Sequence, residues 1–450
     1  MGRIFGTDGV RGIVNRDLSC ELAFGIGVAG AYALTDGDRG RRERILIGRD
    51  TRISCDMLEG ALVAGICSLG AQAVCVGVLP TPALAYLTHH LDADAGVMIS
   101  ASHNPVEYNG IKWVDKNGFK LPDEMEERIE EIILGGIENL PRPMGTGVGR
   151  IVHRENSIDD YIDFLVATTD VRLDGYKIVL DCANGAAYEA APRVFRRLGA
   201  EVIVYGNKPD GTNINENCGS THPQNLQGWV VENGADIGFA FDGDADRLIA
   251  VDAKGNLVDG DRVMAICALD MKRRGVLKHD TLVTTVMSNI GLELAMRDAG
   301  IRLVKTSVGD RYVLEYMRKS GCVLGGEQSG HIIFLDHGTT GDGILTALQL
   351  LSTIVRSGRT LQELSAVMTV FPQVLVNARV DDTRKKGYEE DPEIALRIDC
   401  INKKYHGRGR VLIRPSGTEP LVRVMIEGED EKDALEEALA LAAFIEERLR

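Results

Sequence analysis

Residues 60–79 read GALVAGICSLGAQAVCVGVL and contain no Asp, Glu, Lys or Arg over 20 positions. A stretch of that length could cross a bilayer, but its pattern divides it in two. Residues 61–69 have the apolar spacing of a helix, Gly70 ends that helix, and residues 74–79 are rich in the β-branched residues of a buried strand. Pro80 and Pro82 end the strand. The stretch therefore predicts a helix followed by a strand of a parallel sheet, not a membrane span.

The chain on either side repeats this alternation of short strand-type runs and longer helix-type runs. A polar, Gly/Pro-bearing stretch at 140–149 indicates a domain boundary, and a last group of strands is closed by a helix at 432–449. Such alternation is typical of sheets covered by helices on both faces. We expect three similar mixed α/β sheet domains and a smaller C-terminal α+β domain, at residues 1–150, 151–253, 254–370 and 371–450.

Composition limits the class of protein. A chain of 450 residues is too long for a single core. The formal net charge of −15 argues against nucleic acid as the main partner, so an anionic ligand would need a local arginine cluster. The nine cysteines include no C-x-x-C pair, and the N-terminal residues lack the apolar region of a signal peptide. We expect a cytoplasmic protein with reduced cysteines and no membrane partner.

Ser102 lies in the sequence ASHNP at 101–105, on the loop that leaves the strand predicted at 96–99. By itself it could be a turn or helix-capping serine ahead of Asn-Pro. A serine hydrolase would need a histidine base, but His103 is adjacent and in an extended chain points away from the Ser102 hydroxyl. A serine that carries a phosphoryl group as an ester needs no such base. Ser102 is therefore a candidate phosphoryl carrier.

Three carboxylates, Asp242, Asp244 and Asp246, follow the apolar run 237–241. If they continue that strand, their spacing turns all three to the same side. A hard cation is the natural partner of such a cluster, although a solvated acidic turn remains the alternative. An EF-hand loop is excluded because it needs Gly where Arg247 stands and Glu where Ala253 stands.

Two further loops carry polar groups. One is a Gly-bounded loop after the run 323–324, where Glu327 and Ser329 suit the binding of sugar hydroxyls but could be loop residues without a role. On the same loop, His331 is as readily a core histidine as a catalytic one. The sequence RPSGT at 414–418 suits a dianionic phosphate, or it is a hairpin turn. Arg423 could reach the same anion. Arg11, Arg49 and Arg52 could contact an anion too, or they could form surface ion pairs. Since ligands of open α/β sheets bind outside the carboxyl ends of the strands, the loops of the three α/β domains should face one central cleft.

Taken in order, the motifs at 101–105, 242–247, 326–331 and 414–420 resemble those of the α-D-phosphohexomutases, and the resemblance covers essentially the whole chain. The segments 5–12, 218–223, 287–289 and 308–313 resemble the branch that acts on glucosamine phosphates more than its mannose and glucose relatives. One departure is Ala245, where many members have glycine. A methyl group there should be tolerated if its φ is negative.

The resemblance implies conversion of glucosamine 6-phosphate to glucosamine 1-phosphate, through phosphoserine at Ser102 and a bound 1,6-bisphosphate, on the route to UDP-N-acetylglucosamine. One Mg²⁺ would be held by the three aspartates and the Ser102 phosphate. Arg247 and Lys112 would flank the transferring group, with Lys112 or His331 as general base. Glu327 and Ser329 would bind sugar hydroxyls, and the other substrate-binding residues would be Arg11, Arg414, Ser416, Gly417, Thr418 and Arg423. A phosphomannose or phosphoglucose mutase and a non-catalytic phosphosugar sensor stay as alternatives, and a homodimer is left open.

Overall fold

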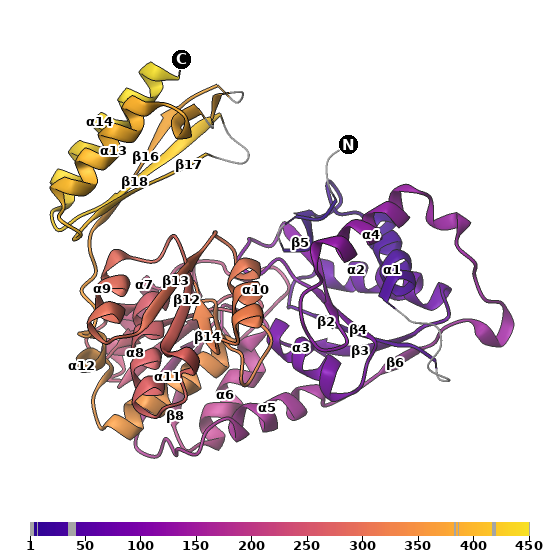
Figure 1. Ribbon diagram of the computed structural model, residues 1–450. Helices are drawn as coiled ribbons and strands as arrows, with labels where there is room; N and C mark the ends of the chain where they lie inside the picture. Colours follow the sequence, from indigo (N-terminus) through magenta and orange to yellow (C-terminus); the bar gives the residue numbers. More distant parts are fainter. Residues whose placement is uncertain are drawn as a thin grey trace. The chain divides into compact units, whose positions relative to one another are not determined.

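The computed structural model describes residues 4–6, 8–34, 42–381, 384–385, 387–415 and 420–449. The chain divides into two compact units, one of residues 1–286 and 302–366 and one of residues 287–301 and 367–450. The first unit contains three sheets and the second contains one (Figure 1). Within the described ranges, no helix combines the length and the apolar character needed to cross a membrane.

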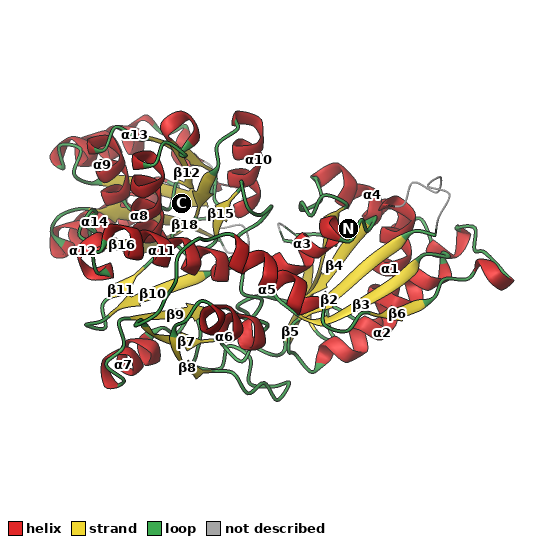
Figure 2. Ribbon diagram, turned by 90° about the horizontal axis from the view of Figure 1, so that it is seen from below, coloured by secondary structure: helices red, strands yellow, loops and turns green. Residues whose placement is uncertain are grey.

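The first sheet has six strands in the order β1-β5-β4-β2-β3-β6. Strands β4, β2, β3 and β6 run parallel, whereas β5 and β1 are antiparallel additions at one edge. Alternate strand residues such as Ile45 and Ile47 join a core with α1, α2 and α4, while Gly48 faces Leu84 of α3 on the other side (Figure 2). The elements are β1 (Val10–Ile13), α1 (Cys20–Leu34), β2 (Arg44–Arg49), α2 (Ser54–Ser68), β3 (Gln72–Val78), α3 (Thr81–His90), β4 (Ala95–Ile99), β5 (Tyr108–Asp115), α4 (Asp123–Leu134) and β6 (Ile151–His153).

The second sheet has the order β11-β10-β9-β7-β8, again with a parallel part, β9-β7-β8, and antiparallel strands at one edge. Val179 and Ala240 pack against α7, whereas Phe239 stacks on Phe195 of α6. The elements are α5 (Ser157–Ala167), β7 (Lys177–Asp181), α6 (Ala187–Arg197), β8 (Glu201–Tyr205), α7 (Gln224–Glu232), β9 (Ile237–Phe241), β10 (Leu248–Asp252) and β11 (Leu257–Val258).

The third sheet, β13-β12-β14-β15, repeats the design with one antiparallel edge strand, β15. Its elements are α8 (Gly260–Arg273), β12 (Thr281–Thr285), β13 (Arg302–Thr306), α10 (Asp310–Ser320), β14 (Leu324–Gly326), β15 (Ile332–Phe334), α11 (Gly343–Ser357) and α12 (Leu361–Ser365). The second unit holds α9 (Ile290–Asp298) and the antiparallel sheet β16-β18-β17, whose core is shared with α13 and α14. Those elements are β16 (Gln373–Arg379), α13 (Pro392–Lys404), β17 (Arg410–Pro415), β18 (Leu421–Glu427) and α14 (Glu431–Arg448).

The predicted fold class is confirmed. The domain boundaries at residues 150 and 253 stay predictions; in the structure, β6 pairs with β3 of the first sheet and β11 with β10 of the second. The polar stretch at 140–149 is therefore a loop on the way to a sheet edge. The apolar stretch 60–79 contains the end of α2 and all of β3, as predicted.

Candidate active site

The three predicted site loops occupy equivalent places in the three sheets. Each leaves the carboxyl end of a strand in the parallel part and reverses the chain into a strand that pairs antiparallel with it: β4 to β5 for Ser102, β9 to β10 for Asp242, and β14 to β15 for Glu327. The loops meet closely. A Cβ added to Gly243 would lie 2.5 Å from the carbonyl oxygen of Ser102, and the Leu248 N–H donates to the Gly330 carbonyl at 3.0 Å.

The three aspartates converge, but not in the way that strand spacing predicted. β9 ends at Phe241, the Ala245 N–H donates to the Asp242 carbonyl at 3.1 Å, and Ala245 has φ of 58°. The segment is thus a turn, and the negative φ that was the condition for tolerating a methyl group at Ala245 is not met. The turn nevertheless gathers ligand atoms of Asp242, Asp244 and Asp246 within 4.8 Å of one another, and all three residues are buried.

The surroundings of this cluster fit a divalent cation. Asp244 Oδ2 accepts hydrogen bonds from Thr81 Oγ1 (2.7 Å) and Lys112 Nζ (3.0 Å), whereas Asp244 Oδ1 and Asp246 Oδ1 are buried without a hydrogen-bond partner. Burial, and then the carboxylates of Asp246 and Asp244, raise the pKa of Asp242 well above its ordinary value. Unpartnered buried carboxylate oxygens are costly, and a hard cation with oxygen ligands would satisfy them.

Ser102 is buried and points at this cluster. Its Oγ donates to Asp242 Oδ2 at 2.5 Å, and its φ of 51° lies in the left-handed region. Because the backbone is not extended there, the expectation that His103 points away is also wrong: His103 Nδ1 lies 3.4 Å from Ser102 Oγ. Burial, followed by the charges of Arg247 and Arg11, lowers the pKa of His103 to about 4. The Ser102 proton is directed to Asp242, so the imidazole does not accept it.

A ring of charged and polar side chains surrounds the site. Lys112 Nζ lies 3.0 Å from Asp244 Oδ2 and 2.9 Å from Asp8 Oδ2, and Asp8 Oδ1 lies 2.7 Å from Lys120 Nζ. Lys120 pairs in turn with Asp310. Asp310 Oδ2 lies 3.5 Å from His331 Nε2, and His331 Nδ1 lies 3.4 Å from Asp246 Oδ2. The ring takes members from all three α/β domains and brings the sequence-predicted Lys112, Asp246 and His331 together.

The geometry bears on the two suggested general bases. Burial lowers the pKa of Lys112, but Asp244 and Asp8 outweigh it and raise the net value, so the ammonium stays charged. The Gly341 N–H donates to His331 Nε2 at 3.0 Å while Nδ1 faces Asp246, which occupies both ring nitrogens. Arg247 Nε, 3.8 Å from Asp246 Oδ1, is buried without a hydrogen-bond partner. Lys112 and Arg247 thus suit charge stabilisation better than proton removal.

The remaining predicted residues divide by environment. Glu327 Oε1 accepts the Gly309 N–H at 3.1 Å, and Ser329 is exposed. Arg11 pairs with Asp8 at 2.7 Å, so it borders the charge ring. Arg49 forms the partly exposed ion pairs that were one alternative, with Asp56 and Glu59. Arg52 does not, because it is fully buried.

In the second unit, Arg414 of β17 lies directly opposite Arg423 of β18. Burial, and then Arg423, lower the pKa of Arg414. Like charges placed opposite each other destabilise a sheet, and a bound anion would relieve that repulsion. Ser416, Gly417 and Thr418 lie outside the described residues.

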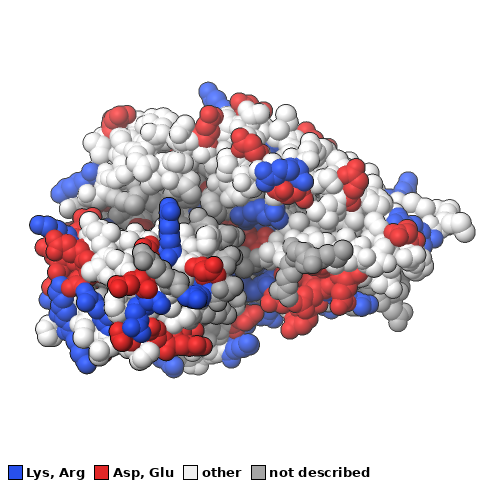
Figure 3. Space-filling view, turned by 90° about the horizontal axis from the view of Figure 1, so that it is seen from above, with Lys and Arg blue, Asp and Glu red and all other residues white. Residues whose placement is uncertain are grey.

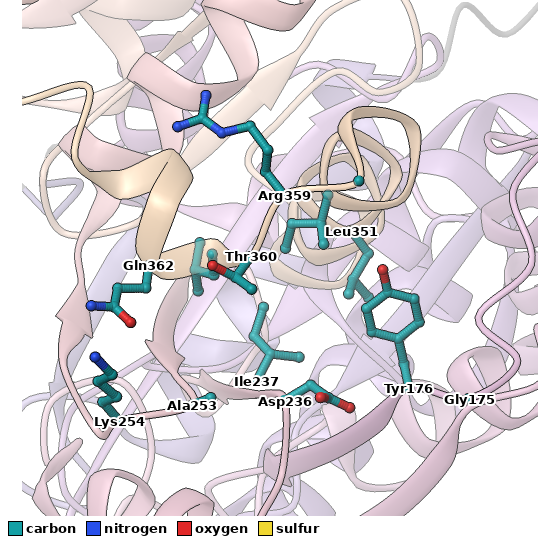
Figure 4. A pocket seen from close by; sticks show the side chains of 13 residues that line it. Gly175, Tyr176, Asp236, Ile237, Ala253, Lys254, Leu351, Arg359, Thr360 and Gln362 are labelled. Atoms are coloured by element: carbon teal, nitrogen blue, oxygen red, sulfur yellow. The ribbon is translucent and has the colours of Figure 1, made fainter.

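Sequence reasoning missed four members of the site: Asp8, Thr81, Lys120 and Asp310. Asp8 and Asp310 stand in segments that were used only for the resemblance, and no local pattern distinguishes Thr81 or Lys120 from ordinary surface residues. A separate cavity of about 420 Å³, lined by Tyr176, Ile237 and Leu351 among others (Figure 4), lies at the opposite end of β9 from Asp242 and contains none of the predicted site residues. On the face shown in Figure 3, acidic and basic side chains are interspersed.

Family models for the four domains of phosphoglucomutase/phosphomannomutase match this chain in order. The alpha/beta/alpha domains I, II and III match residues 2–139, 159–255 and 259–371, and the C-terminal domain matches residues 375–443.

Relatives extend over the full chain. A phosphoglucosamine mutase of Clostridium novyi (strain NT) is 59% identical over 448 residues, covering 100% of this chain and 99% of its own length. One of Thermoanaerobacter sp. (strain X514) is 60% identical over 449 residues, covering 100% of both. The crystal structure of a phosphoglucomutase/phosphomannomutase family protein from Burkholderia thailandensis superimposes with a TM-score of 0.80 at 26% identity, covering 98% of each chain. Because all four domain models match, these relatives cover the full chain, and a serine lies beside an acidic cluster, the chain belongs to the phosphoglucomutase/phosphomannomutase family, the α-D-phosphohexomutases.

Proposed function

We propose that this protein is a phosphoglucosamine mutase, an isomerase that interconverts glucosamine 6-phosphate and glucosamine 1-phosphate. The observation that carries the proposal is the placement of the Ser102 hydroxyl, 2.5 Å from one carboxylate of a cluster that leaves two buried oxygens without partners. A phosphosugar-binding sensor would need neither a buried serine nor this cluster. The relatives at 59% and 60% identity, both named phosphoglucosamine mutase, favour glucosamine over the other sugars.

In the proposed reaction, phosphoserine Ser102 gives its phosphoryl group to the O1 hydroxyl of the 6-phosphate. The Oγ–phosphorus bond breaks as the O1–phosphorus bond forms, and the proton that leaves O1 is balanced by one that restores the Ser102 hydroxyl. The product is a 1,6-bisphosphate, which turns over and returns its 6-phosphoryl group to Ser102. An added bisphosphate would serve as activator, because it can phosphorylate a free Ser102.

Each charged residue has a part consistent with its contacts. Asp242, Asp244 and Asp246 would hold Mg²⁺, which when bound neutralises phosphate charge. Lys112 and Arg247, both kept cationic beside these carboxylates, would stabilise the charge that develops on the transferring group. His331, with both nitrogens engaged, would orient Asp246 instead of acting as a base.

The sugar and the non-transferring phosphate would be held by separate groups. Glu327 would accept hydrogen bonds from sugar hydroxyls and Ser329 would donate one, at hydroxyls that both orientations of the sugar present. Arg414 and Arg423, with Arg11 and residues 416–418, would bind phosphate. We propose that the loops of the three α/β domains face one central cleft, that the protein works in the cytoplasm without a nucleic-acid or membrane partner, and that a homodimer is open to test.

The test is a coupled assay that compares kcat/KM for glucosamine 6-phosphate with the values for glucose 1-phosphate and mannose 1-phosphate, at saturating Mg²⁺ and with bisphosphate activator. Glucosamine phosphate should be preferred, with measurable side activity on glucose phosphate, because a site that tolerates a changed C2 substituent discriminates by only about 10- to 200-fold. A kcat/KM for mannose 1-phosphate equal to that for glucosamine 6-phosphate would transfer the assignment to a phosphomannomutase/phosphoglucomutase. Binding of all three sugars without turnover would indicate a sensor.

A further inference from the structure

We infer that Arg52, a residue that touches neither the Ser102 hydroxyl nor the acidic cluster, is a positioning residue that holds the phosphoserine loop at residues 102–108 in its reactive shape. The inference rests on the proposed function, because it gives that loop its role. The guanidinium of Arg52 carries five N–H groups.

All five of those N–H groups are used. Nε donates to Asp50 Oδ2 at 2.9 Å. Nη1 donates to the carbonyls of Pro105 (2.6 Å) and Tyr108 (3.1 Å), and Nη2 donates to those of Ser102 (2.9 Å) and Asn104 (2.8 Å). Four backbone carbonyls between residues 102 and 108 therefore converge on a single side chain.

Such a residue would be costly in any other setting. Arg52 is 1% exposed and Asp50 is 0% exposed, and a buried ion pair is tolerated only where hydrogen bonds satisfy the remaining polar groups. Here one carboxylate neutralises the charge and four carbonyls take the remaining donors. A planar fork with five donors can do this, whereas the three donors of lysine cannot.

The same ion pair holds the other side of the Ser102 peptide. Asp50 Oδ2 accepts the Ser100 hydroxyl at 2.6 Å, and Ser100 Oγ accepts the Ser102 N–H at 3.0 Å. The carbonyl of Ser102 is thus fixed by Arg52, and its N–H is fixed through Ser100. Asn215 of the second domain adds a bond from Nδ2 to the Ser102 carbonyl at 2.9 Å.

These bonds explain how Ser102 keeps an unfavourable backbone. A left-handed conformation costs a residue other than glycine roughly 1–2 kcal/mol, and it persists only where the surroundings over-determine it. The φ of 51° turns the hydroxyl toward Asp242. Without Arg52, we expect the loop to relax and the hydroxyl, or its phosphate, to move away from the carboxylate cluster.

The direct test compares Arg52→Lys with the matched control Arg49→Lys. Arg49 lies three residues earlier, at the end of β2, and its side chain, 26% exposed, pairs with Asp56 and Glu59. A displacement of about 1 Å from reactive geometry can lower a rate about 100-fold. We expect Arg52→Lys to lose about that factor in kcat with KM for glucosamine 6-phosphate changed less than about threefold, and Arg49→Lys to match the wild type.

A second readout reports the loop without substrate. Hydrogen exchange measured by mass spectrometry should be faster over residues 100–108 in Arg52→Lys than in the wild type or Arg49→Lys, and unchanged in β4. Wild-type kcat, a change confined to KM, or unchanged exchange in folded Arg52→Lys would each overturn the inference. If Arg52→Lys does not fold, Ser100→Ala is the variant to test. It should lower kcat and speed hydrogen exchange at Ser102, each to a smaller degree, and wild-type kcat together with wild-type exchange would refute the inference that Asp50 and Arg52 hold Ser102 through Ser100. A wild-type chain inactive on every phosphosugar would refute the proposed function while the exchange result still stands.

Discussion

Replacing Thr81 by Val should weaken Mg²⁺ binding although Thr81 is not a candidate ligand. Its Oγ1 donates to Asp244 Oδ2 at 2.7 Å, and together with Lys112 it fixes the carboxylate so that the unpartnered Oδ1 is left for the cation. Val is nearly isosteric, so the buried site stays filled, and the Thr81 N–H bond to the Asp244 carbonyl at 3.0 Å is kept. Only the orienting hydrogen bond is removed.

Loss of an outer hydrogen-bond partner typically lowers metal affinity by about 10- to 100-fold, which corresponds to about 1.4–2.7 kcal/mol. Asp244→Asn should cost more. Its amide oxygen must face the two donors, Thr81 and Lys112, so its NH₂ group takes the place of Oδ1 and points at the cation.

The assay is the Mg²⁺ concentration for half-maximal activity, checked by calorimetric titration of Mg²⁺ into the protein. The expected order of affinity is wild type and Thr81→Ser, then Thr81→Val, then Asp244→Asn. A Thr81→Val protein with the same half-saturation as Thr81→Ser would show that Lys112 alone orients the carboxylate. Full activity after exhaustive chelation would remove the metal site altogether.

Three other outcomes are expected. Ser102→Ala should abolish turnover while the melting temperature stays near that of the wild type. Intact-mass spectrometry should show one phosphate on the native chain and none on the variant. Surviving activity in the variant would exclude the phosphoserine mechanism. Arg414→Ala should raise KM for phosphosugars more than it lowers kcat, because it removes a side chain that contacts the phosphate and also removes the repulsion between Arg414 and Arg423. An unchanged KM with a collapsed kcat would show that Arg414 takes part in the chemical step. Burial raises the pKa of Asp342 to about 6, so its stabilising protonated form is present near pH 4 and lost as pH rises to 6, at a cost of up to about 3 kcal/mol. Asp342→Asn can keep an oxygen acceptor for the Leu345 N–H, and its NH₂ group can donate to the Tyr161 oxygen. The variant should therefore gain unfolding free energy relative to the wild type between pH 4 and 6; a constant difference across that range would contradict the assignment.

The sequence was sufficient for the elements and for the residues that stand in local motifs. Helix and strand periodicity placed the end of α2 and β3, and the position after a strand end placed Ser102 and Asp242, because these signals are carried by neighbouring residues. Contacts between domains left no such signal. Lys120 and Asp310 are 190 positions apart and Thr81 and Asp244 are 163 apart, so only the packing of the sheets shows that they meet.

The errors about the Ser102 and Asp242 loops share one physical cause, which is the assumption that the strands continue into the loops. Each of these two loops instead reverses the chain into an antiparallel strand, and the reversal requires backbone in the left-handed region at Ser102 and Ala245. At Ala245 this costs roughly 1–2 kcal/mol relative to glycine, while its fully buried methyl group regains about 0.8 kcal/mol. Burial of the methyl group thus offsets only part of the cost of the left-handed backbone at Ala245. Ser102 has no such compensation in its own side chain, since its hydroxyl is committed to Asp242. The bonds that hold its conformation must come from elsewhere in the chain, and Asp50, Arg52 and Ser100 supply them.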